Sequence, residues 1–411
     1  MNVEELVRDS LREIAGEQPS AGAEFADRVL AVRRRRRTRR LAAVAAATVA
    51  VVSVSVAVPL LDGGKDDVRP AGVTRQDEVS AHPEQSPPRD LIAAGRTALA
   101  TYYTTKTVPR TENDGIAVRT YWLLDPETGT YRKDTRWSYV AVAPGLKRAA
   151  VLEQSLPARR IGLLDLASGK VERWIPVQQG VGGVEFSRDG SKLVATTYSE
   201  NPEARESAVM VAPDGSETHE WMPTAEKVLR TGFCVIDVSG SEGFAWWRVA
   251  AGPHDVGRMD FAFTRDGKYL YSKVSRDMND EQQFYDLSGA KVSAPASERY
   301  LTTQVSARLS PNGKLAALGL TEEAAHGKSY STIADPRTGE EVVKVRGARL
   351  LAWADDKRLI AWEGTPSPEG AALNQLVLVT IGSDKVVPLS GVSDLNKLDG
   401  PARWTPVFAD R

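Results

Sequence analysis

The pattern of hydrophobic and polar positions changes four times along the chain. Residues 1–40 begin with a helical pattern, because apolar side chains in VEELVRDSLREIAGE recur at spacings of three and four. Residues 41–61 carry no charged side chain, and residues 62–90 are polar, contain several prolines and have no period. From residue 91 onward, short apolar runs alternate with turn residues, which indicates β-strands.

The uncharged stretch predicts a membrane crossing. A helix over residues 41–61 would be about 30 Å long, which matches the hydrocarbon core of a bilayer. A basic cluster precedes it, formed by Arg33, Arg34, Arg35, Arg36, Arg37, Arg39 and Arg40. Such arginines stay cytoplasmic, so the C-terminal part is expected to be extracytoplasmic. We expect a retained single-pass anchor in the cell membrane. A cleaved leader and a peripheral helix remain as alternatives, since the stretch is rich in alanine.

The remaining boundaries follow from this crossing. Residues 1–40 are expected to form a cytoplasmic tail with an amphipathic helix and the basic cluster, and residues 62–90 a flexible stalk. The tail helix either lies on a surface or pairs with itself, or it docks a cytoplasmic regulator through residues 1–32. Residues 91–411 are expected to form one extracytoplasmic domain.

Five segments of this domain share one layout, in which an apolar strand, a tight turn and a second apolar strand follow one another. They begin at Tyr139, Val184, Phe261, Ala307 and Leu350. Asp or Asn side chains accept hydrogen bonds from turn amides, and glycine adopts the positive φ of a tight turn. A second hairpin follows each segment, as in LLDLASGKVERW and VMVAPDGSETHEW. Two hairpins make four strands, which is the unit of a β-propeller blade.

The spacing of the turns predicts the number of blades. The turns start at Ala143, Ser187, Thr264, Ser310 and Ala354, at steps of 44, 77, 46 and 44 residues. Because a blade takes about 40–45 residues, the step of 77 suggests one extra, degraded blade. We therefore expect an all-β fold of six or seven blades, with seven favoured. The final ARWTPVFADR is expected to return to the first blade and close the ring.

These turns carry a family resemblance. The segments Ser187-Arg188-Asp189-Gly190, Thr264-Arg265-Asp266-Gly267 and Ser310-Pro311-Asn312-Gly313 are each followed by an apolar strand. In this the chain resembles bacterial WD-repeat-like and TolB-like propeller proteins over about residues 92–411. The full layout also resembles single-pass propeller proteins of actinobacterial type. The resemblance implies a propeller that presents loops on a rigid scaffold.

Composition and motifs exclude several kinds of chemistry. The tail holds ten arginines against seven acidic residues, while the whole chain has a net charge of −1, so the later part is mildly acidic and offers no face for nucleic acid. The basic cluster is instead expected to contact membrane lipid. Cys234 is the only cysteine and the four histidines are scattered, which argues against a zinc site. No nucleophile elbow or phosphate-binding glycine loop occurs, and no cofactor is expected.

The long interval between the turns at Ser187 and Thr264 contains a candidate ligand site. Trp246, Trp247 and Arg248 follow each other in the long interval, and His254 lies close behind. Either one tryptophan and His254 reach the mouth of the propeller and hold a ligand, or both indoles pack between sheets.

The expected function is recognition without catalysis. The propeller would bind an unknown protein, peptide or envelope glycan on its loops. The alternative is a transmembrane signalling protein whose propeller senses and whose N-terminal helix holds a cytoplasmic partner. Its topology resembles that of membrane-bound anti-sigma factors.

Overall fold

The computed structural model describes residues 78–211, 217–224, 230–240, 244–250, 258–276, 279–323, 328–365, 373–394 and 403–411. The basic cluster, the membrane crossing at residues 41–61 and the tail lie outside this part, as does His254. Within the described residues, no helix is long and apolar enough to cross a membrane. All the regular structure there is β-strand, which confirms the all-β prediction.

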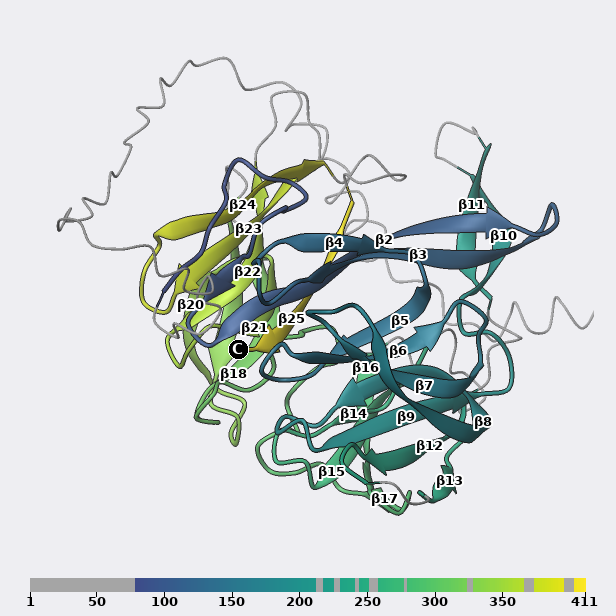
Figure 1. Cartoon of the computed structure of the whole chain (residues 1–411). Helices are drawn as coiled ribbons and strands as arrows, with labels where there is room; N and C mark the ends of the chain where they lie inside the picture. Colours follow the sequence, from purple (N-terminus) through teal and green to yellow (C-terminus); the bar gives the residue numbers. More distant parts are fainter. Residues whose placement is uncertain are drawn as a thin grey trace, which may run out of the picture. The chain divides into compact units, whose positions relative to one another are not determined.

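The described strands pair into five antiparallel sheets; because the two halves of β8 pair with different strands, we divide its sheet there and describe six sheet units, numbered 1 to 6 (Figure 1). Unit 1 contains β25 (Thr405–Asp410), β2 (Thr97–Pro109), β3 (Asp114–Leu124) and β4 (Tyr131–Asp134), with β1 (Ala93–Ala94) beside β2. Unit 2 contains β5 (Trp137–Val142), β6 (Arg148–Glu153), β7 (Ala158–Asp165) and the first half of β8 (Val171–Phe186). Unit 3 contains the second half of β8, then β9 (Lys192–Tyr198), β12 (Arg230–Asp237) and β13 (Trp246–Arg248).

The later units follow in chain order. Unit 4 contains β14 (Ala262–Phe263), β15 (Tyr269–Arg276), β16 (Asn279–Asp286) and β17 (Lys291–Val292). Unit 5 contains β18 (Ala316–Glu323), β19 (Ser329–Ala334) and β20 (Glu341–Arg346), and an isolated bridge between Leu309 and Ala316 adds its first strand. Unit 6 contains β21 (Arg349–Trp353), β22 (Arg358–Thr365), β23 (Leu373–Thr380) and β24 (Val386–Asp394). Successive four-stranded antiparallel units are the organisation of a β-propeller.

The last strand joins the first unit, as the sequence predicted. Strand β25 pairs antiparallel with β2, from Thr97 opposite Asp410 to Tyr103 opposite Thr405. A backbone hydrogen bond also joins units 1 and 6 here, in which Arg96 N donates to Ala354 O at 3.0 Å. A Cβ on Gly95 would lie 2.2 Å from that same carbonyl oxygen, so only glycine permits this approach between units 1 and 6.

The hydrophobic core lies between neighbouring units rather than in one centre. Clusters of buried side chains join units 1 and 2, 2 and 3, 3 and 4, 5 and 6, and 6 and 1. In the cluster between units 6 and 1, Leu99 packs with Ile360 and Leu376. Units 1, 2, 3 and 6 therefore bury both faces, which suits apolar strands such as β6, where four successive residues are buried.

The interval of 77 residues does not contain an extra sheet among the described residues. Its strand β12 pairs with β9, and β13 pairs with β12, so that both strands complete unit 3. The hairpin of β10 (Ala204–Val211) and β11 (Glu217–Pro223), which the sequence suggested as the outer hairpin of this unit, instead pairs with β3, where Ala204 lies opposite Ile116. The length of the interval thus comes from an inserted hairpin. Among the described residues, the length of this interval therefore does not by itself indicate an additional blade.

Residues 78–90, which the sequence analysis assigned to the stalk, contact units 1 and 6. Ser80 pairs with Ala93, and His82 N donates to Leu389 O at 2.9 Å. The side chain of Gln85 is buried and bonds Asp90. Proline and polar residues suggested a stalk, but here their polar groups bond units 1 and 6.

Candidate functional site

Every sheet unit contributes to the wall of an inner cavity of 630 Å³, either with its strands or with the segment that leads into them. Its wall takes one residue or more from every unit, including Phe408, Tyr139, Glu185, Asp260, Ala307 and Trp353. Strand β5 passes from Tyr139 to the turn at Pro144, so these two residues mark opposite ends of the cavity. We call them the network end, at Tyr139, and the turn end, at Pro144.

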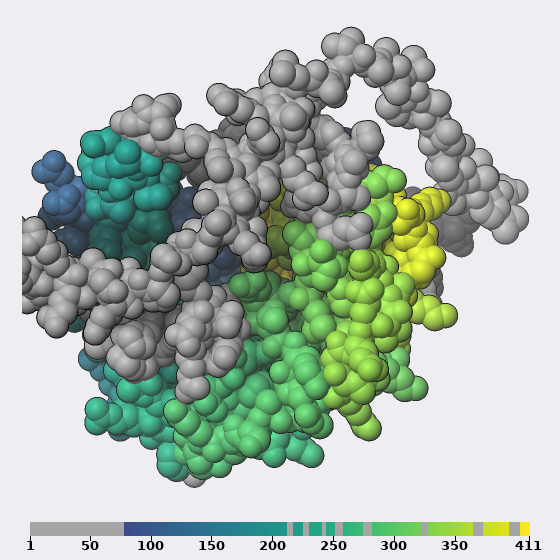
Figure 2. All heavy atoms as spheres, turned by 180° about the vertical axis from the view of Figure 1, so that it is seen from behind, coloured from purple at the N-terminus to yellow at the C-terminus, as the bar shows by residue number. Residues whose placement is uncertain are grey.

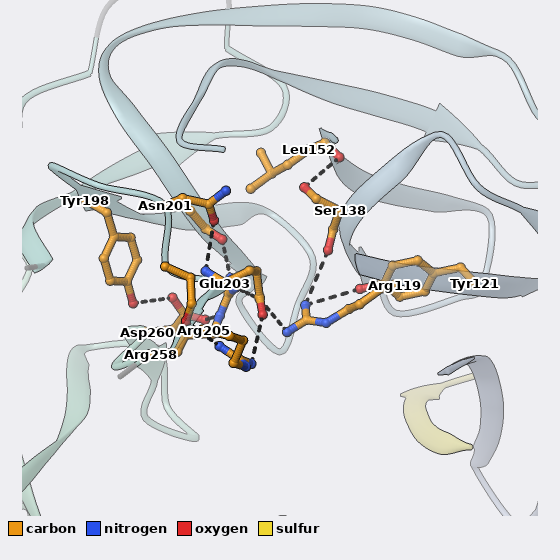
Figure 3. A network of polar contacts seen from close by, with 12 residues as sticks. Arg119, Tyr121, Ser138, Leu152, Tyr198, Asn201, Glu203, Arg205, Arg258 and Asp260 are labelled. Carbon is orange, nitrogen blue, oxygen red and sulfur yellow. Dashed lines mark hydrogen bonds and ion pairs between the residues drawn. The ribbon is translucent and has the colours of Figure 1, made fainter. Parts of the chain in front are cut away.

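An ion network occupies the network end (Figure 3). Figure 3 shows Arg119, Arg205 and Arg258 gathered around the buried Glu203. Arg119 donates to Glu203 Oε1 at 2.7 Å, and Arg258 donates to the same oxygen. Arg205 lies 3.4 Å from Glu203 Oε2. One carboxylate therefore joins three guanidinium groups that come from β3, from β10 and from the segment before β14.

A second carboxylate extends the network. Asp260 accepts from Arg258, and it accepts from the hydroxyl of Tyr198 at 2.8 Å. Arg258 also donates to the backbone oxygen of Gly182. Burial opposes the charge on Arg258, but Asp260 and Glu203 more than offset this, so its pKa lies well above the ordinary value. Arg258 therefore stays charged at any physiological pH.

Aromatic rings cover the two deepest guanidinium groups. The Arg258 guanidinium lies 4.3 Å from the centre of the Tyr139 ring, and that of Arg119 lies 5.0 Å from the centre of the Tyr103 ring. Burial, with Asp260 as a smaller contribution, raises the pKa of Tyr139 and of Tyr198. Both phenols are therefore neutral at physiological pH.

Two adjacent glycines of β8 make room for this network. A Cβ on Gly183 would lie 2.3 Å from Asp260 Oδ1, and one on Gly182 would lie 2.5 Å from the Tyr198 ring. A larger side chain at either glycine would push the side chain of Asp260 or Tyr198 away from the backbone of β8. The ion network and the bend between the two halves of β8 therefore both depend on Gly182 and Gly183.

Glu185 faces the cavity beyond the network. Its side chain is exposed to the cavity space, and among the described residues it has no ion-pair partner. Desolvation by the surrounding protein raises its pKa to about 7, with Arg308 opposing this effect and Asp260 adding to it. Arg308 itself bonds Glu298 at 2.6 Å. Glu185 is thus a carboxyl group that changes charge near neutral pH.

Arginines gather at the turn end. Arg96 lies 2.8 Å and Arg188 lies 3.5 Å from the same oxygen of Asp410. Arg265 follows in the equivalent turn of unit 4. Burial, together with Arg188 and Arg96, lowers the pKa of Arg265. The turn end therefore carries a positive field that Asp410 only partly compensates.

The ligand site predicted from sequence lies elsewhere. Trp246, Trp247 and Arg248 form β13, the outermost strand of unit 3, which pairs with β12. The Trp246 indole donates to Thr197 Oγ1 at 3.0 Å and packs against the core, and Trp247 lies against the turn at Gly289. The structure therefore does not bring Trp246 or Trp247 to the cavity. It favours the alternative in which Trp246 packs against the sheets.

Only some of the residues at the two ends of the cavity could be identified from the sequence. Arg188 and Arg265 occupy the second position of the repeated turns, where other units have Pro144 and Pro311. Comparing turn positions would have identified them. Glu203 and Arg119 are 84 residues apart and belong to no motif.

Two further observations limit the chemistry. Cys234 is a free, buried thiol, and burial raises its pKa to about 12, so it stays protonated. Within the described residues, no group of three or more histidine, cysteine, aspartate or glutamate side chains is placed to hold a metal ion.

No protein-family model matches this chain, and no curated protein sequence does either. Among solved structures, it is similar to TolB from Acinetobacter baumannii, with 16% identity, a TM-score of 0.33, and coverage of 71% of this chain and 67% of that chain. It is similar to the β-propeller domain of Cps50 (Swd1) from Myceliophteria thermophila, with 14% identity, a TM-score of 0.30, and coverage of 69% and 100%. A chain of a mitotic checkpoint complex gives 14% identity, a TM-score of 0.38, and coverage of 87% and 98%.

Proposed function

We propose that this chain is a membrane-anchored, extracytoplasmic six-bladed β-propeller that recognises a protein partner and catalyses no reaction. The six sheet units support the blade number, and the uncharged residues 41–61 behind the basic cluster support the anchor. The charged side chains at the network end bond one another, which supports a structural role for them.

The inserted hairpin carries the proposal of a protein partner. Strands β10 and β11 extend the sheet of unit 1 beyond β3, and in Figure 2 their teal atoms lie beside the blue tip of β2 and β3. Val211 is 65% exposed and Val209 is 51% exposed. By register, both share one face with Trp221, and His219 and Glu217 of β11 lie on the same face. Large apolar side chains that gather on one exposed face are typical of protein interfaces.

The face of this hairpin is a better candidate than its edge. The outer strand β11 carries the exposed charged residues Glu217 and Glu220. Charges on an edge strand hinder pairing with another strand. A partner would therefore cover Val209 and Val211 rather than add a strand to β11.

Site-specific crosslinking in the native cells tests this. A photoreactive benzophenone amino acid replaces Val209, and in a control protein it replaces Val342 on β20, which is also exposed. We expect position 209 to give one discrete adduct with another protein, which Val211→Glu weakens at least tenfold, and position 342 to give none. Equal adducts at both positions, or none at either, would contradict the proposal, and an adduct between two copies of this chain would replace the partner by self-association.

The topology needs its own test. Protease added to intact spheroplasts should digest residues 91–411 and spare residues 1–40. Survival of the C-terminal portion until the cells are lysed would refute the extracytoplasmic placement.

The signalling alternative rests on the amphipathic pattern of residues 1–32. It predicts that these residues retain a soluble cytoplasmic protein. Equal retention by a helix of scrambled sequence would count against it.

A further inference from the structure

A second cavity of 450 Å³ adjoins the inner cavity at its turn end. The two share Glu185 and Arg188 in their walls, and the second cavity adds Arg265, Thr303 and Arg308. A volume of this size falls in the range of small-molecule sites. Its wall combines three arginines and several hydroxyl groups with two glutamates, Glu185 and Glu298, and Glu298 is paired with Arg308.

Two buried polar atoms in this wall have no hydrogen-bond partner. They are Arg265 Nη1 and Thr303 Oγ1. Nearly all buried polar groups in proteins are paired, because an unpaired one loses its water without compensation. Other arginines with an unpaired buried Nε, such as Arg346, use their remaining nitrogens in an ion pair. Among the described residues, the guanidinium of Arg265 forms neither a hydrogen bond nor an ion pair.

The nearby carboxylates are already engaged. Asp410 lies against Arg96 and Arg188, and Asp356 accepts from the backbone of Asn312 at 2.7 Å. Glu298 accepts from Arg308 and from the backbone nitrogen of Arg265. The charged guanidinium of Arg265 therefore lines the cavity without an acceptor from the described protein residues.

We propose that Arg265 and Thr303 bind one oxyanion, a carboxylate or a phosphate group, of a small ligand in this cavity, with Arg188 as a second positive charge. A guanidinium offers a planar pair of N–H donors that matches the oxygens of either group, and the threonine hydroxyl can donate a further bond. This site is independent of the inserted hairpin, so it goes beyond the proposed recognition of a protein.

Glu185 should modulate the site. It lines the same cavity and becomes neutral as the pH falls below its pKa of about 7, which removes a negative charge that opposes an incoming anion. The groups that act on Glu185 are Arg308, Asp260 and the backbone of Phe263, and none of them reverses this direction. Acetate, whose own charge is constant between pH 6 and 8, should bind more tightly at pH 6.

The test uses the purified full-length chain, titrated separately with inorganic phosphate and with acetate, and with chloride as the reference at equal ionic strength. The melting temperature and the heat of binding are measured. We expect a saturating response to one or both anions. Saturation by phosphate alone identifies a phosphate site, and saturation by acetate alone identifies a carboxylate site.

Matched variants make the test specific. Arg265→Gln should weaken binding at least tenfold, and Arg265→Lys and Thr303→Ala should each weaken it about threefold or more. Arg160→Gln, which removes an exposed arginine paired with Glu153, should leave binding unchanged. Val209→Ser with Val211→Ser should also leave it unchanged, which separates this site from the hairpin. A response that does not saturate, or one that Arg265→Gln leaves intact, overturns the proposal.

Discussion

The two ends of the inner cavity hold similar residues in opposite electrostatic states. At the network end, each guanidinium near Glu203 has a carboxylate partner, and Tyr139 and Tyr103 cover the deepest two. At the turn end, the guanidinium of Arg265 has no partner among the described residues and is repelled by Arg188. Compensated buried charges hold units together, whereas an uncompensated one favours an incoming anion. The number of arginines alone therefore does not distinguish structure from binding.

The largest effect should come from breaking the network end. Glu203→Ala would leave Arg119 and Arg258 without their shared carboxylate, and removing one member of a buried ion pair costs about 3–5 kcal/mol of unfolding free energy. Chemical denaturation measures this loss. The control is Glu153→Ala, whose pair with Arg160 is exposed, so its loss should be much smaller. Equal losses in the two variants would show that the network does not stabilise the fold.

A smaller effect should follow from crowding the same network. Gly183→Ala would place a methyl group against Asp260, and overpacking of this kind costs about 1–3 kcal/mol. The same measurement in a chain that already carries Asp260→Ala should show a smaller penalty, because the clash is then removed. An unchanged penalty would place the strain elsewhere in β8.

Between the two ends, Glu185→Gln should alter the pH dependence of stability. The folded protein raises the pKa of Glu185 from 4.5 to about 7, so it holds this proton more tightly than the unfolded chain does. Glu185 therefore lowers wild-type stability as the pH rises from about 4.5 to 7, and the effect is constant above 7. Glu185→Gln should match the wild type near pH 4 and exceed it at pH 8, by about 1 kcal/mol after screening by cavity water. Equal stability of the two at pH 8 would contradict the raised pKa.

The smallest effect on stability is expected at the turn end. Arg265→Gln removes a charge that has no partner and that Arg188 and Arg96 oppose, so unfolding free energy should change by less than about 0.5 kcal/mol or rise slightly. Chemical denaturation without phosphate or acetate measures this. A loss as large as that of Glu203→Ala would mean that Arg265 has a structural partner, and the contrast between the two ends would disappear.

Local features of the fold could be predicted from the sequence. The turn at Ser187 and its counterparts specify tight hairpins through side chains and glycines that are close in sequence. The return of the final strand was predictable as well, since an open edge on unit 1 would be unfavourable. In these cases, the determining residues are neighbours along the chain or follow from a general rule.

Contacts between distant segments could not be predicted in the same way. The hairpin of β10 and β11 was evident, but its attachment to β3 depends on the pairing of Ala204 with Ile116, which no repeat encodes. The network end has the same character, because Arg258 meets Glu203 from 55 residues away. Trp246 and Trp247 suggested a ligand site because Arg248 and His254 follow them closely in the sequence, yet their strand lies at the outer edge of unit 3.

The pairing of β25 with β2 has a consequence for biosynthesis. Strand β2 leaves the ribosome long before its partner exists, since the contact between Arg96 and Asp410 spans 314 residues. Until then the nascent chain exposes an apolar strand that could pair wrongly, and closure over such a distance is slow. A holding chaperone would protect the chain during this delay. Deleting the six residues of β25 should consequently yield aggregates rather than a slightly shorter soluble protein.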